Sequence, residues 1–462
     1  MSDISTCVTE VREAFAKGLT KPSKWRKSQL KALDRLLVEN EQAITGALRD
    51  DLGKHPSEAY TTEISIVRGE ISHTLSHLGR WLAPKPVKPS IAVLPANAYT
   101  ILEPLGVALI IAPWNYPVQL LLGPLVGAIA AGNSVILKPS ELAPRTSTLI
   151  ATLVPRYLDT RAIRVVEGAV EETTALLEEK FDHIFYTGNG RVARIVMAAA
   201  AKNLTPVTLE LGGKSPTYVD ETADLDAVAK RLAWGKFVNA GQTCVAPDYV
   251  LASESIAQEL ASKVSAAITA MYGTNVQSND QYGRIVNENH FDRLVGLMDE
   301  SAGNGAVAHG GSSSRGDLFI EPTVLLGTQR TAPVMGQEIF GPILPIIPVY
   351  SVDDAIDFIN AGDKPLALYV FTNRKDVRQR FLRDTSSGAL GFGLPVAHLA
   401  IPDLPFGGVG ESGMGAYHGK RSIEIFSHEK SVVSKPMVPD TMALVYPPFS
   451  PKKLGIVRRL LG

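Results

Sequence analysis

Apolar segments of strand length alternate with segments of helical period through the first half of this chain. The expected strands are residues 107–112, 134–137, 163–167, 183–186 and 207–211, and the expected helices between them are 118–131, 145–154, 171–178 and 191–201. Strands that are apolar at every position typically belong to a parallel sheet that helices cover on both faces. We therefore predict an α/β fold for this half.

The same alternation resumes after residue 213 and predicts a second α/β unit. Helices are expected at 223–235, 256–272, 352–360 and 376–383, and strands at 249–253 and 367–371. Residues 303–317 are rich in Gly and Ser and are predicted to form an exposed loop. Residues 404–415 contain too many glycines for a helix or a strand interior, which indicates a loop that passes close to something large.

The N-terminal residues 8–82 have helical periodicity, and a proline cluster ends them. Residues 90–104 then alternate without helix signals, so we expect a strand pair or an arm. The C-terminal residues 452–462 mix basic and apolar positions. Two interpretations stay open for them, a membrane-surface helix and a short solvated tail, and the brevity of the segment favours the tail.

Composition excludes some functional classes. The formal net charge is −1 over 462 residues, so no overall field favours nucleic acid or an anionic membrane. The two cysteines, Cys7 and Cys244, provide no disulfide framework, which is typical of a reducing compartment. The N-terminus is polar, with no secretory apolar region behind it. We expect a cytoplasmic protein with no nucleic-acid partner.

One uncharged stretch resembles a membrane span, because no charged residue occurs between Glu103 and Lys138. However, Pro113, Pro117 and Pro124 would break a single helix there. A buried strand, a turn, a buried helix and a second strand explain the stretch better than a transmembrane helix does.

Polar and glycine residues follow the expected strands, at the edge where parallel sheets bind ligands. These segments are Pro113–Pro117, Lys138–Glu141, Thr187–Gly190 and Gly212–Lys214. Gly188, Asn189 and Gly190 precede a helix, whose first N–H groups can contact a phosphate. Lys138 and Glu141 can hold ribose hydroxyls, and Glu141 would repel a 2′-phosphate, which favours NAD over NADP. The alternatives are ordinary strand–helix turns and a surface pair at a helix start.

The stretch Asn239-Ala240-Gly241-Gln242-Thr243-Cys244 is a small, polar turn that ends in one of the two cysteines. Gly241 lets the backbone approach a ligand closely. Two interpretations remain open from this stretch alone. Cys244 is either a catalytic nucleophile or a small buried hydrophobe, which is the usual fate of a cysteine without a disulfide.

Several motifs together resemble the NAD(P)-dependent aldehyde dehydrogenase family. They are Pro113-Trp114-Asn115, Lys138-Pro139-Ser140-Glu141, Leu209-Glu210-Leu211-Gly212-Gly213-Lys214, Gly241-Gln242-Thr243-Cys244 and Glu338-Ile339-Phe340-Gly341-Pro342. Pro405-Phe406-Gly407-Gly408 and Tyr417-His418-Gly419-Lys420 resemble the class 3 branch, which acts on fatty and aromatic aldehydes. The resemblance covers residues 51–451. It implies a non-acylating oxidation of a hydrophobic aldehyde to the carboxylic acid.

The resemblance also implies a domain plan. A Rossmann-like NAD-binding domain would comprise residues 1–82 and 105–212, and an α/β catalytic domain residues 213–421. A small β oligomerisation arm would comprise 83–104 and 422–445, with a C-terminal tail at 446–462. The expected assembly is a homodimer, without a membrane anchor.

The resemblance assigns catalytic roles to three residues. Cys244 would be the nucleophile that forms a thiohemiacetal and then a thioester. Asn115 would stabilise the oxyanion together with the backbone N–H of Cys244. Glu210 would be the general base that activates water for hydrolysis. Taken singly, Asn115 and Glu210 could also be a turn residue and a buried ion-pair partner.

The resemblance places a cofactor, NAD with NADP possible, against a further set of residues. Lys138 and Glu141 would contact the adenosine ribose, and Glu338 the nicotinamide ribose. The pyrophosphate would lie near Trp114, Gly188, Asn189 and Gly190, and Phe340 would pack near the nicotinamide ring. No metal is expected. The chain departs from the family at Asn189 and Ala193, and at residues 389–395, which lack the usual Gly-x-x-x-Asn-Asp pattern.

Three other functions fit parts of the sequence. An enzyme that transfers the acyl group to coenzyme A is disfavoured by Glu210, because a water-activating base would waste the thioester. A catalytically silent binding protein is disfavoured by the joint presence of Cys244, Glu210 and Asn115. A cysteine hydrolase ranks last, because no Cys–His–Asn order stands out near Cys244.

Overall fold

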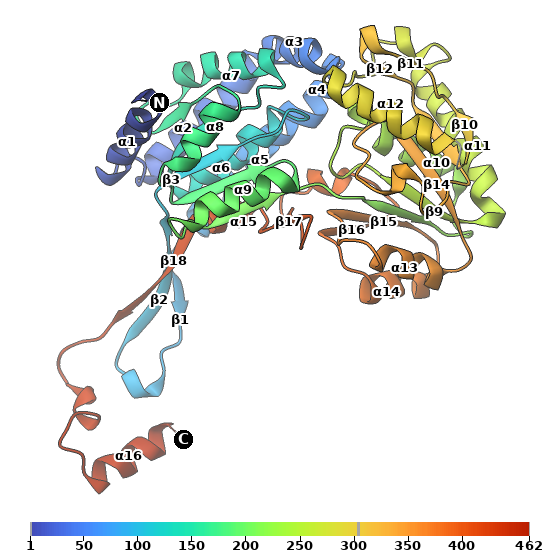
Figure 1. The fold of residues 1–462 in the computed structure, drawn as a ribbon. Helices are drawn as coiled ribbons and strands as arrows, with labels where there is room; N and C mark the ends of the chain where they lie inside the picture. The colour runs from blue at the N-terminus through green and yellow to red at the C-terminus, as the bar shows by residue number, and fades with distance from the viewer. Residues whose placement is uncertain (1, 303–304, 462) are drawn as a thin grey trace.

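The computed structural model describes residues 2–302 and 305–461. Two α/β lobes lie side by side, and a narrow β arm projects from the first lobe, with the C-terminal helix at its far end (Figure 1). Each lobe is built around its own sheet, of six and seven strands. The predicted α/β class is confirmed by this arrangement.

The sheet of the first lobe has the strand order β17-β7-β6-β3-β4-β5. Its strands are β3 (Val107–Ile111), β4 (Ser134–Lys138), β5 (Ile163–Val165), β6 (His183–Thr187), β7 (Val207–Glu210) and β17 (Gly413–Met414). The first five are parallel, and β17 pairs antiparallel with β7. The chain order reverses between β3 and β6, and such a switch point is where doubly wound sheets bind dinucleotides.

Helices of the first lobe cover this sheet. They are α1 (Ser2–Ala16), α2 (Ser23–Glu39), α3 (Glu41–Leu52), α4 (Pro56–Ala59), α5 (Ser65–Trp81), α6 (Gln119–Ala131), α7 (Pro144–Tyr157), α8 (Val170–Glu178), α9 (Gly190–Ala201) and α15 (Gly419–Ile425). A π-helical turn, Tyr60–Ile64, joins α4 to α5. The uncharged stretch forms β3, a turn, α6 and β4, as the sequence predicted. None of the helices in the described residues is both long and apolar enough to cross a membrane.

The second sheet has the order β10-β13-β14-β9-β8-β15-β16, and only β10 is antiparallel to its neighbour. Its strands are β8 (Pro216–Val219), β9 (Tyr249–Ser253), β10 (Ala306–His309), β13 (Thr323–Leu326), β14 (Ile343–Val349), β15 (Ala367–Phe371) and β16 (Ala389–Phe392). The helices are α10 (Leu225–Phe237), α11 (Glu254–Tyr272), α12 (Glu288–Ala302), α13 (Val352–Asn360) and α14 (Lys375–Asp384).

The prediction of an exposed loop over residues 303–317 was wrong in part. Residues 303 and 304 lie outside the described residues, but β10 and the strand β11 (Ser313–Ser314) occupy much of the remainder. The strand β11 pairs with β12 (Phe319–Ile320). These edge strands are held by backbone hydrogen bonds, which Gly- and Ser-rich sequences also supply, so composition alone misled the prediction.

The arm consists of β1 (Lys85–Val87), β2 (Asn97–Pro104) and β18 (Ser427–Ser434). The strand β18 pairs antiparallel with the whole length of β2, so two segments far apart in sequence build one ribbon (Figure 1). The expected strand pair therefore starts before residue 90 and includes a strand from the C-terminal region. Residues Pro451–Leu461 form helix α16, a conformation that fits both interpretations of this segment.

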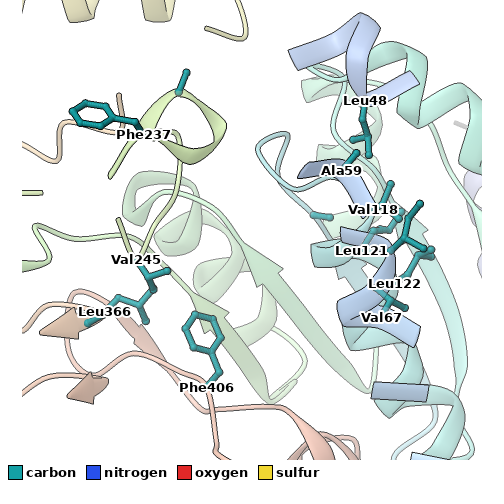
Figure 2. Close-up of a cluster of buried hydrophobic side chains, with 14 of the residues drawn as sticks. Leu48, Ala59, Val67, Val118, Leu121, Leu122, Phe237, Val245, Leu366 and Phe406 are labelled. Atoms are coloured by element: carbon teal, nitrogen blue, oxygen red, sulfur yellow. The ribbon is translucent and has the colours of Figure 1, made fainter. Parts of the chain in front are cut away.

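Buried aliphatic side chains form a core that reaches the centre of the molecule. Figure 2 shows Val118, just before α6, and Leu121 of α6 beside Val67 of α5, and Val245 near Leu366 and Phe406. Val245 follows Cys244 directly and is fully buried. The cysteine segment is therefore anchored by packing and is not an independent surface loop.

Candidate active site

The carboxyl ends of β3 and β7 supply two of the predicted catalytic side chains. Asn115 lies four residues beyond the end of β3, and Glu210 is the last residue of β7. Both side chains are buried, with exposed fractions of 3% and 2%. The backbone oxygen of Glu210 accepts a hydrogen bond from the N–H of Gly188 at the end of β6, which joins the two strand ends.

The segment that carries Cys244 has an unusual backbone. Helix α10 ends at Phe237, and Asn239, Ala240 and Gly241 then have φ values of 53°, 51° and 75°. A Cβ atom on Gly241 would lie 2.3 Å from the carbonyl oxygen of Gly341, so only glycine fits there without a shift. These left-handed residues turn the chain sharply and direct it from α10 into the site.

Hydrogen bonds tie this segment to Asn115. The Nδ2 atom of Asn115 donates to the backbone oxygen of Gln242 at 3.0 Å, and Asn239 Nδ2 donates to the backbone oxygen of Asn115 at 2.9 Å. The hydroxyl groups of Tyr116 and Thr243 are 2.6 Å apart. The structure therefore places Asn115 immediately beside the cysteine segment, although they are far apart in sequence.

The carboxylate of Glu210 is buried, and neither of its oxygens has a hydrogen-bond partner among the described residues. Burial raises the pKa of Glu210 well above its ordinary value. A buried carboxyl without partners is costly, so its retention points to a chemical role rather than a structural one.

Cys244 is half-buried and shares an electrostatic environment with two carboxylates. Burial is the main cause that raises the pKa of its thiol to about 12, and Glu338 and Glu210 raise it further. The coupling shows that Cys244, Glu210 and Glu338 converge on one site. A neighbouring positive charge would be needed to favour the thiolate.

Glu338 comes from the loop between β13 and β14, in the second lobe. Its carboxylate lies against Gly212, where a Cβ atom would be 2.2 Å from Oε2, and it accepts a hydrogen bond from the N–H of Gly213. Burial raises the pKa of Glu338 to about 8. The Phe340 ring packs edge-on against Trp114 with centroids 5.4 Å apart, so the two lobes meet here.

The predicted adenosine end of the site lies along the same sheet edge. Lys138 is buried, and its Nζ atom is 3.5 Å from Oε2 of the exposed Glu141. Asn189 caps α9, because its side chain accepts a hydrogen bond from the N–H of Val192. These residues therefore form a polar group of their own, at the ends of β4 and β6.

These residues fit a nicotinamide dinucleotide on structural grounds. A cation and a carboxylate follow β4, a helix N-terminus follows β6, and both flank the switch point of the sheet. At Gly188 a Cβ atom would lie 2.2 Å from the hydroxyl oxygen of Tyr186, so the Tyr186 side chain packs against this glycine and leaves no room for a larger residue.

The structure adds charged residues that sequence reasoning missed. Lys236 of α10 is buried with an exposed fraction of 1%, and burial lowers its pKa to about 8. Lys214 pairs with Asp248 and donates to the backbone oxygen of Gln337 at 2.8 Å, which holds the loop of Glu338. Lys54 and Glu63 form a fully buried ion pair beside Asn115. For Lys236 and Glu63 the available signal was a charged residue in an apolar segment of helical period, whereas Lys54 and Lys214 lie outside helices and gave no such signal.

Two further predictions concerned loops. The glycines of residues 404–415 face the protein's own backbone: Cβ atoms on Gly408 and Gly413 would lie 1.9 Å from Ser412 O and 2.4 Å from Leu209 O. The large object that this loop passes is therefore strand β7. The departing segment 389–395 contains β16, whose neighbour Tyr369 donates a hydrogen bond to the backbone oxygen of Val245.

Comparisons with known proteins agree with this architecture. The model of the "Aldehyde dehydrogenase family" matches residues 1–432. The chain is 48% identical to the rat "Aldehyde dehydrogenase, dimeric NADP-preferring", over 98% of this chain and 99% of that protein. It is 46% identical to "Aldehyde dehydrogenase family 3 member H1" of Arabidopsis thaliana, over 100% and 95%.

Solved structures of similar fold are also aldehyde dehydrogenases. A substrate-bound state of Staphylococcus aureus AldH has a TM-score of 0.96 and 43% identity, and the match covers 99% of each chain. A Mycobacterium tuberculosis aldehyde dehydrogenase complexed with NAD+ has a TM-score of 0.84 and 28% identity, covering 95% and 91%. The chain belongs to the aldehyde dehydrogenase family, in which its close relatives are family 3 members, and it is an NAD(P)-dependent oxidoreductase that converts an aldehyde to the carboxylic acid.

Proposed function

We propose that Cys244 is the nucleophile of this oxidation and that the acyl group passes through a thioester on its sulfur. The thiolate attacks the aldehyde carbon, and a C–S bond forms as the carbonyl oxygen becomes an oxyanion. The Asn115 amide, which donates to the backbone oxygen of Gln242 at 3.0 Å, would donate its other N–H to that oxyanion. NAD(P)+ supplies the hydride acceptor, and loss of hydride from the former aldehyde carbon leaves a thioester.

Glu210 would then activate the water that hydrolyses this thioester. Its carboxylate takes one proton from water while the hydroxide adds to the acyl carbon, and the C–S bond breaks to release the acid. The raised pKa of Glu210 makes it a stronger base than an exposed glutamate. The observation that carries the proposal is this buried carboxylate without partners among the described residues, coupled electrostatically to Cys244. Such a base favours a free acid over a coenzyme A ester.

Finer features remain proposals. We infer that the aldehyde is hydrophobic, aliphatic or aromatic, as in the branch that the motifs resemble. Trp234 of α10 and Phe392 of β16 retain exposed or half-buried surface that such a substrate could contact. Glu141 supports a preference for NAD, although a rat relative is named NADP-preferring. That relative is also named dimeric, which supports a homodimer for this chain. A cytoplasmic location is part of the same proposal.

The two cysteines allow a controlled test. Purified Cys244→Ala and Cys7→Ala variants are assayed for NADH formation with hexanal and benzaldehyde, and the acyl product is identified by mass spectrometry with and without coenzyme A. We expect Cys7→Ala to match the wild type, Cys244→Ala to be inactive, and the product to be the free acid. Undiminished turnover in Cys244→Ala, or acyl-CoA as the main product, would overturn the proposal.

A further inference from the structure

A buried cation lies directly behind the proposed oxyanion residue. Lys54 has an exposed fraction of 0% and follows Gly53, the left-handed cap of α3. Its Nζ atom lies 2.5 Å from Oε1 of Glu63 and donates to the backbone oxygen of Asn115 at 2.8 Å. It also stands 4.0 Å from the centre of the Tyr116 ring. One ammonium group therefore contacts the turn after β3 at two consecutive residues.

Glu63 extends this contact to the start of α6. Its Oε2 atom accepts hydrogen bonds from the N–H groups of Val118 and Gln119, at 2.8 Å and 3.1 Å. These amides are otherwise unsatisfied at a helix N-terminus, which also favours a negative charge. Glu63 itself lies in the π-helical turn Tyr60–Ile64, a kind of irregularity that is frequent at functional sites. The pair thus fixes the chain from Asn115 to the first residue of α6.

The cysteine segment contacts the same carbonyl group. Asn239 Nδ2 donates to the backbone oxygen of Asn115 and, at 3.1 Å, to that of Gln242. Glu58 Oε1 in turn accepts a hydrogen bond from the N–H of Asn239 at 3.0 Å. The backbone oxygen of Asn115 is therefore the meeting point of Lys54 from the first lobe and of the segment that carries Cys244.

Stability alone does not explain why Lys54 and Glu63 are buried as an ion pair. Removing two charges from water costs several kcal/mol for each ion, and well-packed apolar residues of similar volume are often as stabilising. The contacts of Lys54 and Glu63 nevertheless converge on the few residues from Asn115 to Gln119. Such contacts hold the backbone of Asn115 in a fixed position, and position matters because displacement of a reacting group by about 1 Å can cost about 10²-fold in rate.

We propose that Lys54 and Glu63 are a positioning pair that holds the Asn115 amide in register with Cys244 for oxyanion stabilisation. Neither residue touches the reacting atoms. The inference rests on the proposed function, in which Asn115 donates to the oxyanion. Loss of the pair should therefore lower kcat and kcat/KM together, because the interaction that it supports is made only in the transition state.

The test is a double-mutant cycle between the pair and Asn115. The variants are Lys54→Met/Glu63→Gln, Asn115→Ala and the triple combination, and kcat and KM are measured with hexanal and NAD+. The Glu63→Gln change keeps a side-chain oxygen that can accept from the amides of α6. The double change removes both charges of the pair together, and Glu58, which both residues influence, is left as the neighbouring carboxyl. The control is Arg26→Met, which removes another buried cation whose guanidinium donates to Ala130 O, near the opposite end of the same helix.

We expect Asn115→Ala to lower kcat by about 10²-fold to 10³-fold and the pair variant by about 10²-fold, with aldehyde KM little changed. In the Asn115→Ala background the pair change should cost less than about threefold, because its target is already gone. Arg26→Met should lower the melting temperature and leave kcat near that of the wild type.

Each departure from this pattern has a distinct meaning. A wild-type kcat in Asn115→Ala would overturn the oxyanion role, and with it the proposed mechanism. A slow Asn115→Ala variant combined with a fully additive pair change would overturn the positioning role alone, as would a pair variant with wild-type kcat. A pair variant that does not fold, beside a folded Arg26→Met, would also count against it, since the pair would then serve the fold.

Discussion

The reactivity of Cys244 without cofactor tests the electrostatics of the site. Burial and the carboxylates of Glu338 and Glu210 raise the pKa of the thiol from an ordinary value of 9.0 to about 12. At pH 7.5 a thiol with a pKa of 9.0 is about 3% thiolate, whereas Cys244, with a pKa of about 12, would be about 0.003% thiolate. The difference is about 10³-fold and corresponds to about 4 kcal/mol.

Part of the rate that is lost through the low thiolate fraction is recovered, because a thiolate of higher pKa is a better nucleophile. With a Brønsted coefficient of about 0.4–0.5, three pKa units return about 15-fold to 30-fold in rate. Cys244 should therefore react with iodoacetamide about 30-fold to 60-fold more slowly than an exposed cysteine at pH 7.5. The rate should rise about tenfold per pH unit up to pH 10 without a plateau.

The assay uses the Cys7→Ala background, so that Cys244 is the single alkylation site, and follows the adduct by intact mass between pH 6.5 and 10. Glu338→Gln removes the larger of the two carboxylate contributions and should accelerate labelling above about pH 8, where Glu338 is ionised. A plateau below pH 9 in the cofactor-free enzyme, or no acceleration in Glu338→Gln, would refute this account of the thiol.

Single contacts support three further predictions. Burial raises the pKa of Glu70 to about 7, so protonation of Glu70 contributes up to about 3 kcal/mol to stability below pH 4.5, and this contribution is lost as the pH rises to 7. Glu70→Gln should therefore gain thermal stability relative to the wild type between pH 5 and pH 8. A difference in melting temperature that does not depend on pH would contradict this. Gly241→Ala should lower kcat by about 10²-fold because its Cβ would meet Gly341, whereas Gly273→Ala, at a similar φ of 77° but with open space around it, should leave kcat unchanged. Equal effects on kcat would show that backbone strain at a positive φ is responsible, and not the contact with Gly341. Glu141→Gln should raise the ratio of kcat/KM for NADP+ to that for NAD+ about tenfold by removing a charge that repels a 2′-phosphate, and an unchanged ratio would exclude Glu141 as the discriminator.

The sequence predicted the first sheet well because its signal is local. Five largely apolar strands alternate with helices, and the ends of parallel strands necessarily share one edge. Asn115 was therefore expected at this edge from the pattern, and the structure places it there. Glu210 lay within the expected strand 207–211, and only the family resemblance assigned it a role, although the structure ends β7 at this residue. Glu338 comes from another lobe, and only the family resemblance connected it with Cys244 before the fold was known.

Features that depend on tertiary packing were not predictable from the chain. Lys54 follows a helix stop, where a lysine is ordinarily solvated, yet it is fully buried because Glu63 and Asn115 satisfy its ammonium group. The edge strand β10 lies in a Gly- and Ser-rich stretch that was expected to be an exposed loop. In each case a distant partner or the backbone itself decides the structure, and neither is visible in local composition.

The most direct test of the mechanism is to stop it at the thioester. In Glu210→Gln the base is replaced by an amide of similar size, so hydrolysis should slow while acylation proceeds. Mixing this variant with hexanal and NAD+ should give one burst of NADH equal to the enzyme concentration, followed by slow turnover. Intact-mass and peptide analysis should find a hexanoyl group on Cys244. Undiminished steady turnover in Glu210→Gln, or a burst with no acyl group on Cys244, would contradict the account.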